Sequence, residues 1–134
     1  DFAGSVVVHA MGGWIALLVA RALAQAGEAV RLKGMVLIAP AVDFTERLMW
    51  ANLPEAARQD IERNGFWLRP SDYSPEPYPI TRALIEDGRA HLLFDGALRS
   101  YCPVHILQGM RDPDVPWRHA LTRWRGWRSA AAVP

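Results

Sequence analysis

The chain has 134 residues, of which 51% are hydrophobic and 22% are charged, and its formal net charge is +1. This composition is ordinary for one globular domain with a modest core, and the small net charge implies no polyelectrolyte partner such as nucleic acid. A single cysteine, Cys102, excludes an internal disulfide and predicts a reducing, cytoplasmic compartment. No apolar run approaches the ~20 residues of a membrane span.

The first predicted element is a buried strand at residues 6–8, where three valines follow one another. Gly12 and Gly13 then read as a tight turn, and residues 15–26 carry apolar side chains at helical spacing. Gly27 stands where a glycine at a helix C-terminus belongs. The chain opens almost directly on this strand, without a signal peptide, so we expect it to begin within a domain.

Two further short apolar runs predict buried strands. Residues 34–40 are stopped by Pro40, and residues 103–108 are ended by Gly109. The ~20 residues between the first two strands hold one helix, as a right-handed crossover between parallel strands requires. The predicted fold class is therefore α/β, with a parallel sheet of three strands flanked by helices in a single domain over residues 1–134.

Residues 41–100 contain no convincing strand and predict a helical lid inserted into that domain. A helix is expected over residues 54–63, with Pro54 near its first position and Gly65 closing it. The proline-rich residues 69–79 predict an irregular loop.

A second helix of this lid is expected to begin after Thr81, whose hydroxyl is suited to capping it, and to run to about His91. Leu84 and Ile85 are expected to point inward from it.

A strand, a sharp turn and a helix are the setting of a nucleophile elbow, whose motif is G-x-S-x-G. Residues 8–13 resemble the elbow of the α/β-hydrolases in its Gly-His-Ser-Met-Gly-Gly form, and the sequence here is Val-His-Ala-Met-Gly-Gly. The resemblance places Ala10 at the position of the nucleophilic serine and makes the backbone N–H of Met11 an oxyanion donor. Val8 also replaces the first glycine, and alanine has no group that can attack a carbonyl.

A second motif follows the third predicted strand. Residues 109–116 resemble the acid loop of the same superfamily, G-x-x-D-x-x-V-P, and the resemblance makes Asp112 the acid that orients the catalytic histidine. Asp114 is the rival acid, and the structural alternative for Asp112 is a turn aspartate before Pro113. The order of nucleophile before acid is that of the α/β-hydrolases, and ligand sites in parallel sheets lie at the carboxyl ends of the strands.

Residues 43–50, 78–82 and 108–112 look like the palmitoyl-thioesterase and carboxylesterase group of that superfamily. The resemblance covers roughly residues 5–121 and implies hydrolysis of a small-molecule ester or thioester by a serine nucleophile, with no cofactor and no metal. It does not extend to the family's first oxyanion loop or its catalytic histidine. We therefore expect a partial domain that is inactive as it stands; the alternative is a non-catalytic, hydrolase-like fragment or decayed gene product that serves at most in binding.

Other residues are weaker candidates for chemistry. His9 reads as a packing histidine, His105 as a core residue, His91 as the end of a helix and His119 as the start of one. Cys102 has no base at a motif-like distance, so a thiol nucleophile is not favoured. Four aromatic residues of the lid are equally suited to lining an acyl pocket or to packing the lid itself: Trp50, Trp67, Tyr73 and Tyr78.

Two surfaces carry expectations about partners. Residues 5–8 are expected to present an unpaired, apolar sheet edge, which predicts self-association. The tail from Thr122 no longer resembles the family and is rich in Arg, Trp and Ala, so we expect it to be poorly ordered. Binding of nucleic acid or membrane through this tail is a third and weaker hypothesis.

Overall fold

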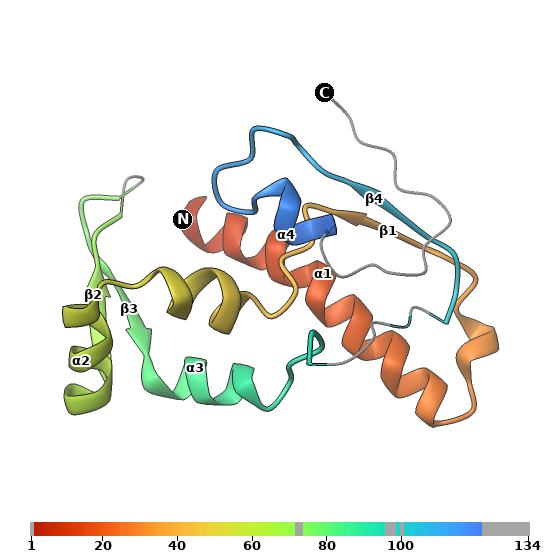
Figure 1. The fold of residues 1–134 in the computed structure, drawn as a ribbon, viewed down its shortest axis with the longest axis horizontal. Coiled ribbons are helices and arrows are strands. Elements are labelled where there is room, and N and C mark those ends of the chain that lie inside the picture. The colour runs from red at the N-terminus through yellow and green to blue at the C-terminus, as the bar shows by residue number, and fades with distance from the viewer. Residues whose placement is uncertain (1, 72–73, 96–98, 100, 122–134) are drawn as a thin grey trace.

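The computed structural model describes residues 2–71, 74–95, 99 and 101–121, and it describes residues 2–10 and 121 by their backbone alone. Two parallel strands, β1 (Met35–Ile38) and β4 (Val104–Leu107), lie beside the long helix α1 (Phe2–Gln25) (Figure 1). Met35 is aligned with Val104 and Ile38 with Leu107. The second and third predicted strands and their parallel orientation are therefore confirmed. The expectation for residues 122–134 lies outside the described residues.

The predicted first strand is wrong, because residues 6–8 belong to α1, which runs without a break through Gly12 and Gly13. A strand leaves its backbone N–H and C=O groups unpaired until neighbouring strands are added, whereas a helix pairs them within the segment. The alanine-rich sequence of α1 also favours a helix. A short apolar run alone does not distinguish a buried strand from a helical turn, and the three valines at residues 6–8 are in a helical turn.

The C-terminal end of α1 follows the prediction. Gly27 has φ of 75°, and its N–H donates to Ala24 O at 3.1 Å while the N–H of Glu28 donates to Leu23 O at 2.8 Å. These two bonds form a Schellman motif, which needs a left-handed residue and therefore favours glycine. Beyond it, the short 3₁₀ helix η1 (Ala29–Arg31) leads the chain back to β1.

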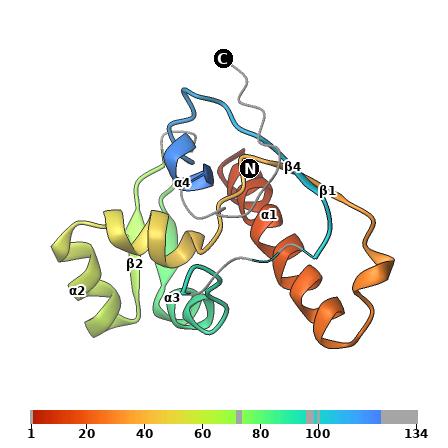
Figure 2. The ribbon, with the colours of Figure 1, turned by 45° about the vertical axis from the view of Figure 1, so that its right-hand side comes forward.

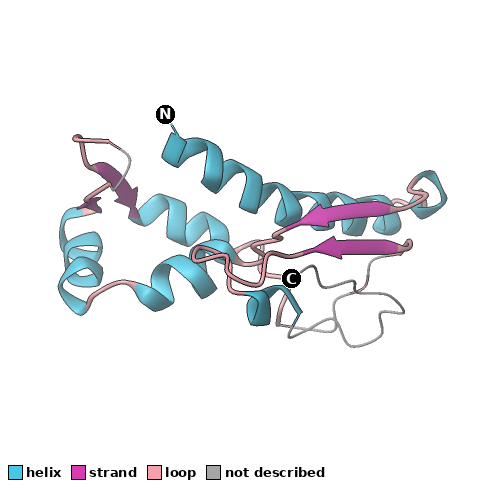
Figure 3. Ribbon diagram, turned by 90° about the horizontal axis from the view of Figure 1, so that it is seen from above, coloured by secondary structure: helices cyan, strands magenta, loops and turns pink. Residues whose placement is uncertain are grey.

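The sheet packs its core against α1. Figure 3 shows α1 running alongside the two strands, and alternate strand residues point toward it. The buried side chains of this core come from α1, both strands and the segments that follow and precede them: Trp14, Leu17, Leu37, Val42, Leu93, Phe94, Val104 and Ile106.

Residues 41–100 are here called the insertion segment, and its described helices and strands between residues 45 and 89 lie beside the sheet and enclose a second core (Figure 2). The segment contains a π-helical turn, η2 (Thr45–Met49), a 3₁₀ turn, η3 (Trp50–Asn52), and two α-helices, α2 (Glu55–Asn64) and α3 (Arg82–Arg89). Its own buried core consists of Met49, Leu53, Ala57, Ile61, Ile80 and Ile85.

Both predicted helices of the insertion segment are confirmed, with their caps. Gly65 ends α2 with φ of 83°, and the Oγ1 of Thr81 accepts a hydrogen bond from Leu84 N at 3.2 Å at the start of α3. Ile85 is buried as expected, but Leu84 is exposed. The inward face of α3 is therefore narrower than the sequence predicted.

The expectation of no strand in residues 41–100 is wrong. β2 (Phe66–Arg69) and β3 (Tyr78–Thr81) pair in an antiparallel hairpin, in which Leu68 is opposite Pro79. Proline is tolerated in such a strand because each strand of a two-stranded sheet is an edge, so a missing N–H can face away from the partner. The prolines in residues 69–79 favour a loop in the sequence, but the two ends of this stretch belong to the β2–β3 hairpin.

After β4, a turn leads to the short helix α4 (Trp117–Leu121). None of the helices within the described residues combines the length and the apolar character needed to cross a lipid bilayer.

Candidate functional site

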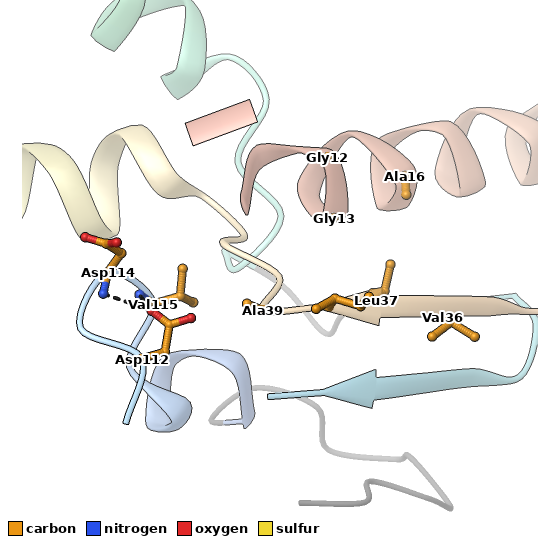
Figure 4. A pocket seen from close by; sticks show the side chains of 10 residues that line it. Gly12, Gly13, Ala16, Val36, Leu37, Ala39, Asp112, Asp114 and Val115 are labelled. Atoms are coloured by element: carbon orange, nitrogen blue, oxygen red, sulfur yellow. Dashed lines mark hydrogen bonds between the residues drawn. The ribbon is translucent and has the colours of Figure 1, made fainter. Parts of the chain in front are cut away.

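A cavity of about 480 Å³ lies where the two sequence motifs meet (Figure 4). It is bounded by α1, by the carboxyl end of β1 and by the loop after β4. Its lining is mostly apolar and consists of Gly12, Gly13, Ala16, Val36, Leu37, Ile38, Ala39, Asp112, Asp114 and Val115. The glycines of the elbow motif and the acid of the second motif therefore face one space, at the carboxyl end of a parallel strand.

The loop that carries Asp112 is fixed by side chains of its own. The Oδ1 of Asp112 accepts hydrogen bonds from the N–H groups of Asp114 and Val115, both at 2.9 Å. The buried side chain of Gln108, at the end of β4, donates from Nε2 to Val115 O at 2.8 Å. Within the described residues, the Oδ2 of Asp112 makes no hydrogen bond to protein, so this oxygen is left for a further group.

Asp114 also lines the cavity, but its side chain is exposed and its own N–H serves to hold Asp112. A half-buried carboxylate with one oxygen restrained is better suited to orienting a partner than an exposed one. The geometry thus favours Asp112 over Asp114, and the acid role stays a prediction.

The nucleophile position lies inside α1. Ala10 and Met11 both belong to the uninterrupted helix, so the strained turn of an elbow is not formed there. An amide inside a helix donates to the carbonyl four residues earlier, whereas an oxyanion donor must be free. The roles of Ala10 and Met11 therefore stay predictions.

One expected property of the elbow motif is present. Small residues are needed there for close packing of the helix, and a Cβ built on Gly13 would lie 2.8 Å from the Cβ of Pro40 and 3.0 Å from its Cα. At Gly12 no atom of the described residues outside the helix's own backbone lies within 4 Å of such a Cβ. Gly13 is thus the glycine that lets α1 approach the segment after β1.

Asp43 is a buried polar residue that the sequence analysis did not single out. Its side chain is fully buried, and its two carboxylate oxygens accept hydrogen bonds from Leu93 N and Phe94 N, each at 2.8 Å. Its backbone has φ of 54°, and Ala39 has φ of 45°, so the turn around Pro40 holds two non-glycine residues in the left-handed region. The sequence signal for it is its place as the first residue of the stretch 43–50, which resembles the thioesterase group and follows β1 by a few residues.

His119 is held away from the cavity lining. Its Nε2 forms a hydrogen bond with Val42 O at 2.8 Å, and its ring meets Phe94 edge to face at a centroid distance of 5.5 Å. Burial lowers the pKa of His119, against smaller opposing effects of the Val42 carbonyl and of Asp43. The prediction that His119 starts a helix is confirmed in α4.

The other histidines are placed as follows. His105 is exposed on β4, so the expectation of a core residue is wrong; alternate residues of the strand face away from α1. The residue His91 follows α3, and its carbonyl accepts a hydrogen bond from Trp14 Nε1 at 3.2 Å. His9 belongs to α1, and its side chain lies outside the described part of the chain.

The remaining candidates do not line the cavity. Burial raises the pKa of the Cys102 thiol, which disfavours the nucleophilic thiolate. Trp50, Trp67 and Tyr78 pack against the core of the insertion segment, whereas Tyr73 lies outside the described residues. The described His, Cys, Asp and Glu side chains form no group of three that could hold a metal ion.

The fold and the cavity define the class of protein. A parallel sheet flanked by helices, with a cavity at the carboxyl ends of its strands and an aspartate loop after the last strand, is the arrangement of an α/β-hydrolase. The chain is 44% identical to a putative hydrolase from Agrobacterium vitis S4, with a TM-score of 0.78 over 93% of this chain and 50% of that one. It is a relative of the α/β-hydrolases.

More particular relatives agree with the group suggested by the sequence. The chain is 35% identical over 117 residues to the mitochondrial palmitoyl-protein thioesterase ABHD10 of Bos taurus, and 32% identical to that of Homo sapiens. The structure of alpha/beta hydrolase domain-containing protein 10 from mouse matches with a TM-score of 0.70 at 27% identity, over 90% of this chain and 47% of that one. The chain spans 36% of the length of these curated thioesterases. No family model matches it.

Proposed function

We propose that this chain derives from an ester or thioester hydrolase of the carboxylesterase or palmitoyl-thioesterase type and, as it stands, binds such a ligand without hydrolysing it through a serine triad. The observation that carries the proposal is Ala10 at the position of the nucleophile. A methyl group supplies neither a nucleophile nor a proton to transfer. The names of the thioesterase relatives support the ligand class.

The chemistry of the cavity supports binding. Its apolar lining suits an acyl chain, and the Oδ2 of Asp112 offers one hydrogen-bond acceptor at the rim of that surface. No cofactor is proposed, because ester hydrolysis by a triad uses side chains alone. The side chain of His119 supports the loss of triad chemistry, since its Nε2 is engaged with Val42 O.

Turnover of p-nitrophenyl acetate and of a medium-chain acyl thioester tests the proposal. We expect no rate above that of heat-denatured protein, and no labelling by a serine-directed phosphonate. The Ala10→Ser variant is expected to stay more than tenfold below an intact hydrolase, because a serine without its base stays protonated. Turnover that disappears in Asp112→Asn would overturn the proposal and identify a working acid.

Binding is tested separately with a non-hydrolysable thioether analogue of the acyl thioester, by calorimetry. Ala16→Phe fills the cavity and is expected to abolish binding, whereas Val30→Phe, at an exposed position outside the cavity, is expected to leave it unchanged. Absence of binding to the unmodified chain would favour the second candidate, a hydrolase-like fragment without a ligand. That candidate is favoured by the helical conformation of the elbow stretch.

Three further expectations are part of the proposal. The chain is treated as one domain over residues 1–134, with residues 41–100 as its lid. A cytoplasmic location rests on the single Cys102, although the curated relatives are named mitochondrial. Self-association is proposed as well, but not through residues 5–8, because these residues are helical and form no sheet edge.

A further inference from the structure

β1 and β4 form a two-stranded sheet, so the outer edge of β1, like that of β4, has no strand partner among the described residues. The N–H groups of Met35 and Ala39 donate to Pro103 O and Leu107 O, both at 2.9 Å, so the odd-numbered residues of β1 face β4. Successive backbone groups of a strand point in opposite directions, so those of Val36 and Ile38 point to the other edge. Such an edge is a template for pairing with another strand.

Exposed apolar surface borders this edge. The side chains of Val36 and Ile38 are 64% and 68% exposed. On α1, a stripe of small and apolar residues at helical spacing consists of Gly12, Ile15, Ala16 and Val19. Gly12 and Ala16 line the same cavity as Val36, so this stripe lies beside β1. Ile15 and Val19 are 53% and 51% exposed. Because apolar side chains lie on both sides of this open edge, a partner with an apolar protein surface is favoured over a polar ligand.

The charges at the two ends of β1 have opposite signs. Lys33, before the strand, is exposed and has no ion pair within the described part of the chain, whereas its neighbour Arg31 pairs with Glu28. Asp114 is exposed and lines the same cavity as Ala39, the residue that follows β1 (Figure 4). A strand that is basic at its start and acidic at its end is complementary to an antiparallel copy of itself.

We propose that β1 pairs antiparallel with β1 of a second copy of this chain, so that Lys33 of each copy faces Asp114 of the other. Val36 of one copy then lies opposite Ile38 of the other, and the outward backbone groups of both strands bond each other. Pro40, which lacks an N–H, ends the pairing on one side. The proposal does not rest on ligand binding by the cavity, and it moves the expected contact from residues 5–8 to β1.

Sedimentation velocity over a hundredfold range of concentration tests the pairing in the full chain. We expect a monomer–dimer equilibrium that Ile38→Lys weakens at least tenfold, because a lysine on an edge strand opposes pairing. Leu68→Lys, at an exposed position on β2, is the matched control and is expected to dimerise like the unmodified chain. A monomer at every concentration, or an equal effect of the two lysines, would overturn the proposal.

Exchanging the charges of Lys33 and Asp114 tests the antiparallel orientation of the two β1 strands without changing a residue of β1 itself. Lys33→Glu and Asp114→Lys are each expected to weaken dimerisation, because each places like charges opposite one another. An equimolar mixture of the two variants restores both contacts, and so does the double variant in one chain. Failure of the mixture to dimerise better than either variant would rule out the antiparallel arrangement.

Discussion

The acid loop, residues 108–116, keeps every fixed residue of its family motif, whereas the elbow stretch, residues 5–14, lacks the first glycine and the serine of its motif and does not form the predicted strand and turn. The acid loop is held by contacts within nine residues of sequence: Asp112 binds the two amides that follow it, and Gln108 binds Val115. The elbow stretch is helical. A strand must find its hydrogen bonds in neighbouring strands, which lie far away in the sequence.

The difference teaches which motifs can be expected to fold from local information. Asx-type turns carry their own acceptors, so their geometry follows from a short sequence. An elbow depends on pairing between its strand and neighbouring strands, whereas a helix pairs its backbone groups within the segment. Two interior glycines then stand in α1, each at a cost of about 0.5–1 kcal/mol relative to alanine. The low helix propensity of these glycines conflicts with the helical conformation of the stretch, and such a conflict makes a conformation easier for tertiary contacts to change.

The largest effect on stability is expected at Asp43, whose side chain accepts two hydrogen bonds from residues far away in the sequence. Asp43→Ala leaves two buried amides without acceptors, and hydrogen bonds to a charged group contribute about 1.5–3 kcal/mol each. We expect the free energy of unfolding to fall by about 3 kcal/mol or more, measured by urea denaturation. Asp43→Asn keeps one oxygen acceptor and tolerates the positive φ, so about half of that loss is expected. A loss below about 1 kcal/mol for alanine would show that local contacts hold this turn too.

The two glycines of the elbow stretch provide a matched pair. Gly13→Ala is expected to destabilise the protein by about 1–3 kcal/mol, because its methyl group meets the backbone and ring of Pro40. The methyl group of Gly12→Ala has no neighbour within 4 Å among the described side chains, so this variant is expected to stabilise the helix by about 0.5–1 kcal/mol. Urea denaturation of both variants decides between helix and elbow: destabilisation by Gly12→Ala would mean that this residue is in a turn.

The sequence sufficed for features with local or strongly periodic signals. The strands that became β1 and β4 and the caps at Gly27, Gly65 and Thr81 were all predictable, and so was a turn at Asp112, which was the structural alternative to its role as the acid. The hairpin of β2 and β3 was not, because Pro79 is tolerated only through its place at an edge. The role of Asp43 was not predictable either, since its partners lie fifty residues further along the chain.

A smaller effect is expected in the acid loop. Asp112→Ala removes the acceptor for two amides that are partly open to water, so we expect a loss of about 1 kcal/mol. Asp112→Asn keeps Oδ1 as an acceptor and is expected to stay close to the unmodified protein. Asp114→Ala is the control, because only its backbone serves the loop. Equal losses in Asp112→Asn and Asp112→Ala would mean that the charge, rather than the turn, fixes the loop.

The smallest effect is a dependence of stability on pH through His119, which ties the turn after β1 to α4. Burial lowers the pKa of His119 below its ordinary value of 6.5, so the unfolded chain binds a proton more readily than the folded one. The stabilisation is therefore complete above pH 6.5 and decreases as the pH falls from 6.5 toward the lowered pKa. Among the charges near the ring, Asp43 opposes this shift and Arg47 adds to it. Urea midpoints at pH 7.5 and 5.5 measure the change, and His119→Gln, which retains a donor for Val42 O but does not titrate, is expected to lose less stability over that interval. If the unmodified protein and His119→Gln lose equal stability between pH 7.5 and 5.5, groups other than His119 cause the pH dependence.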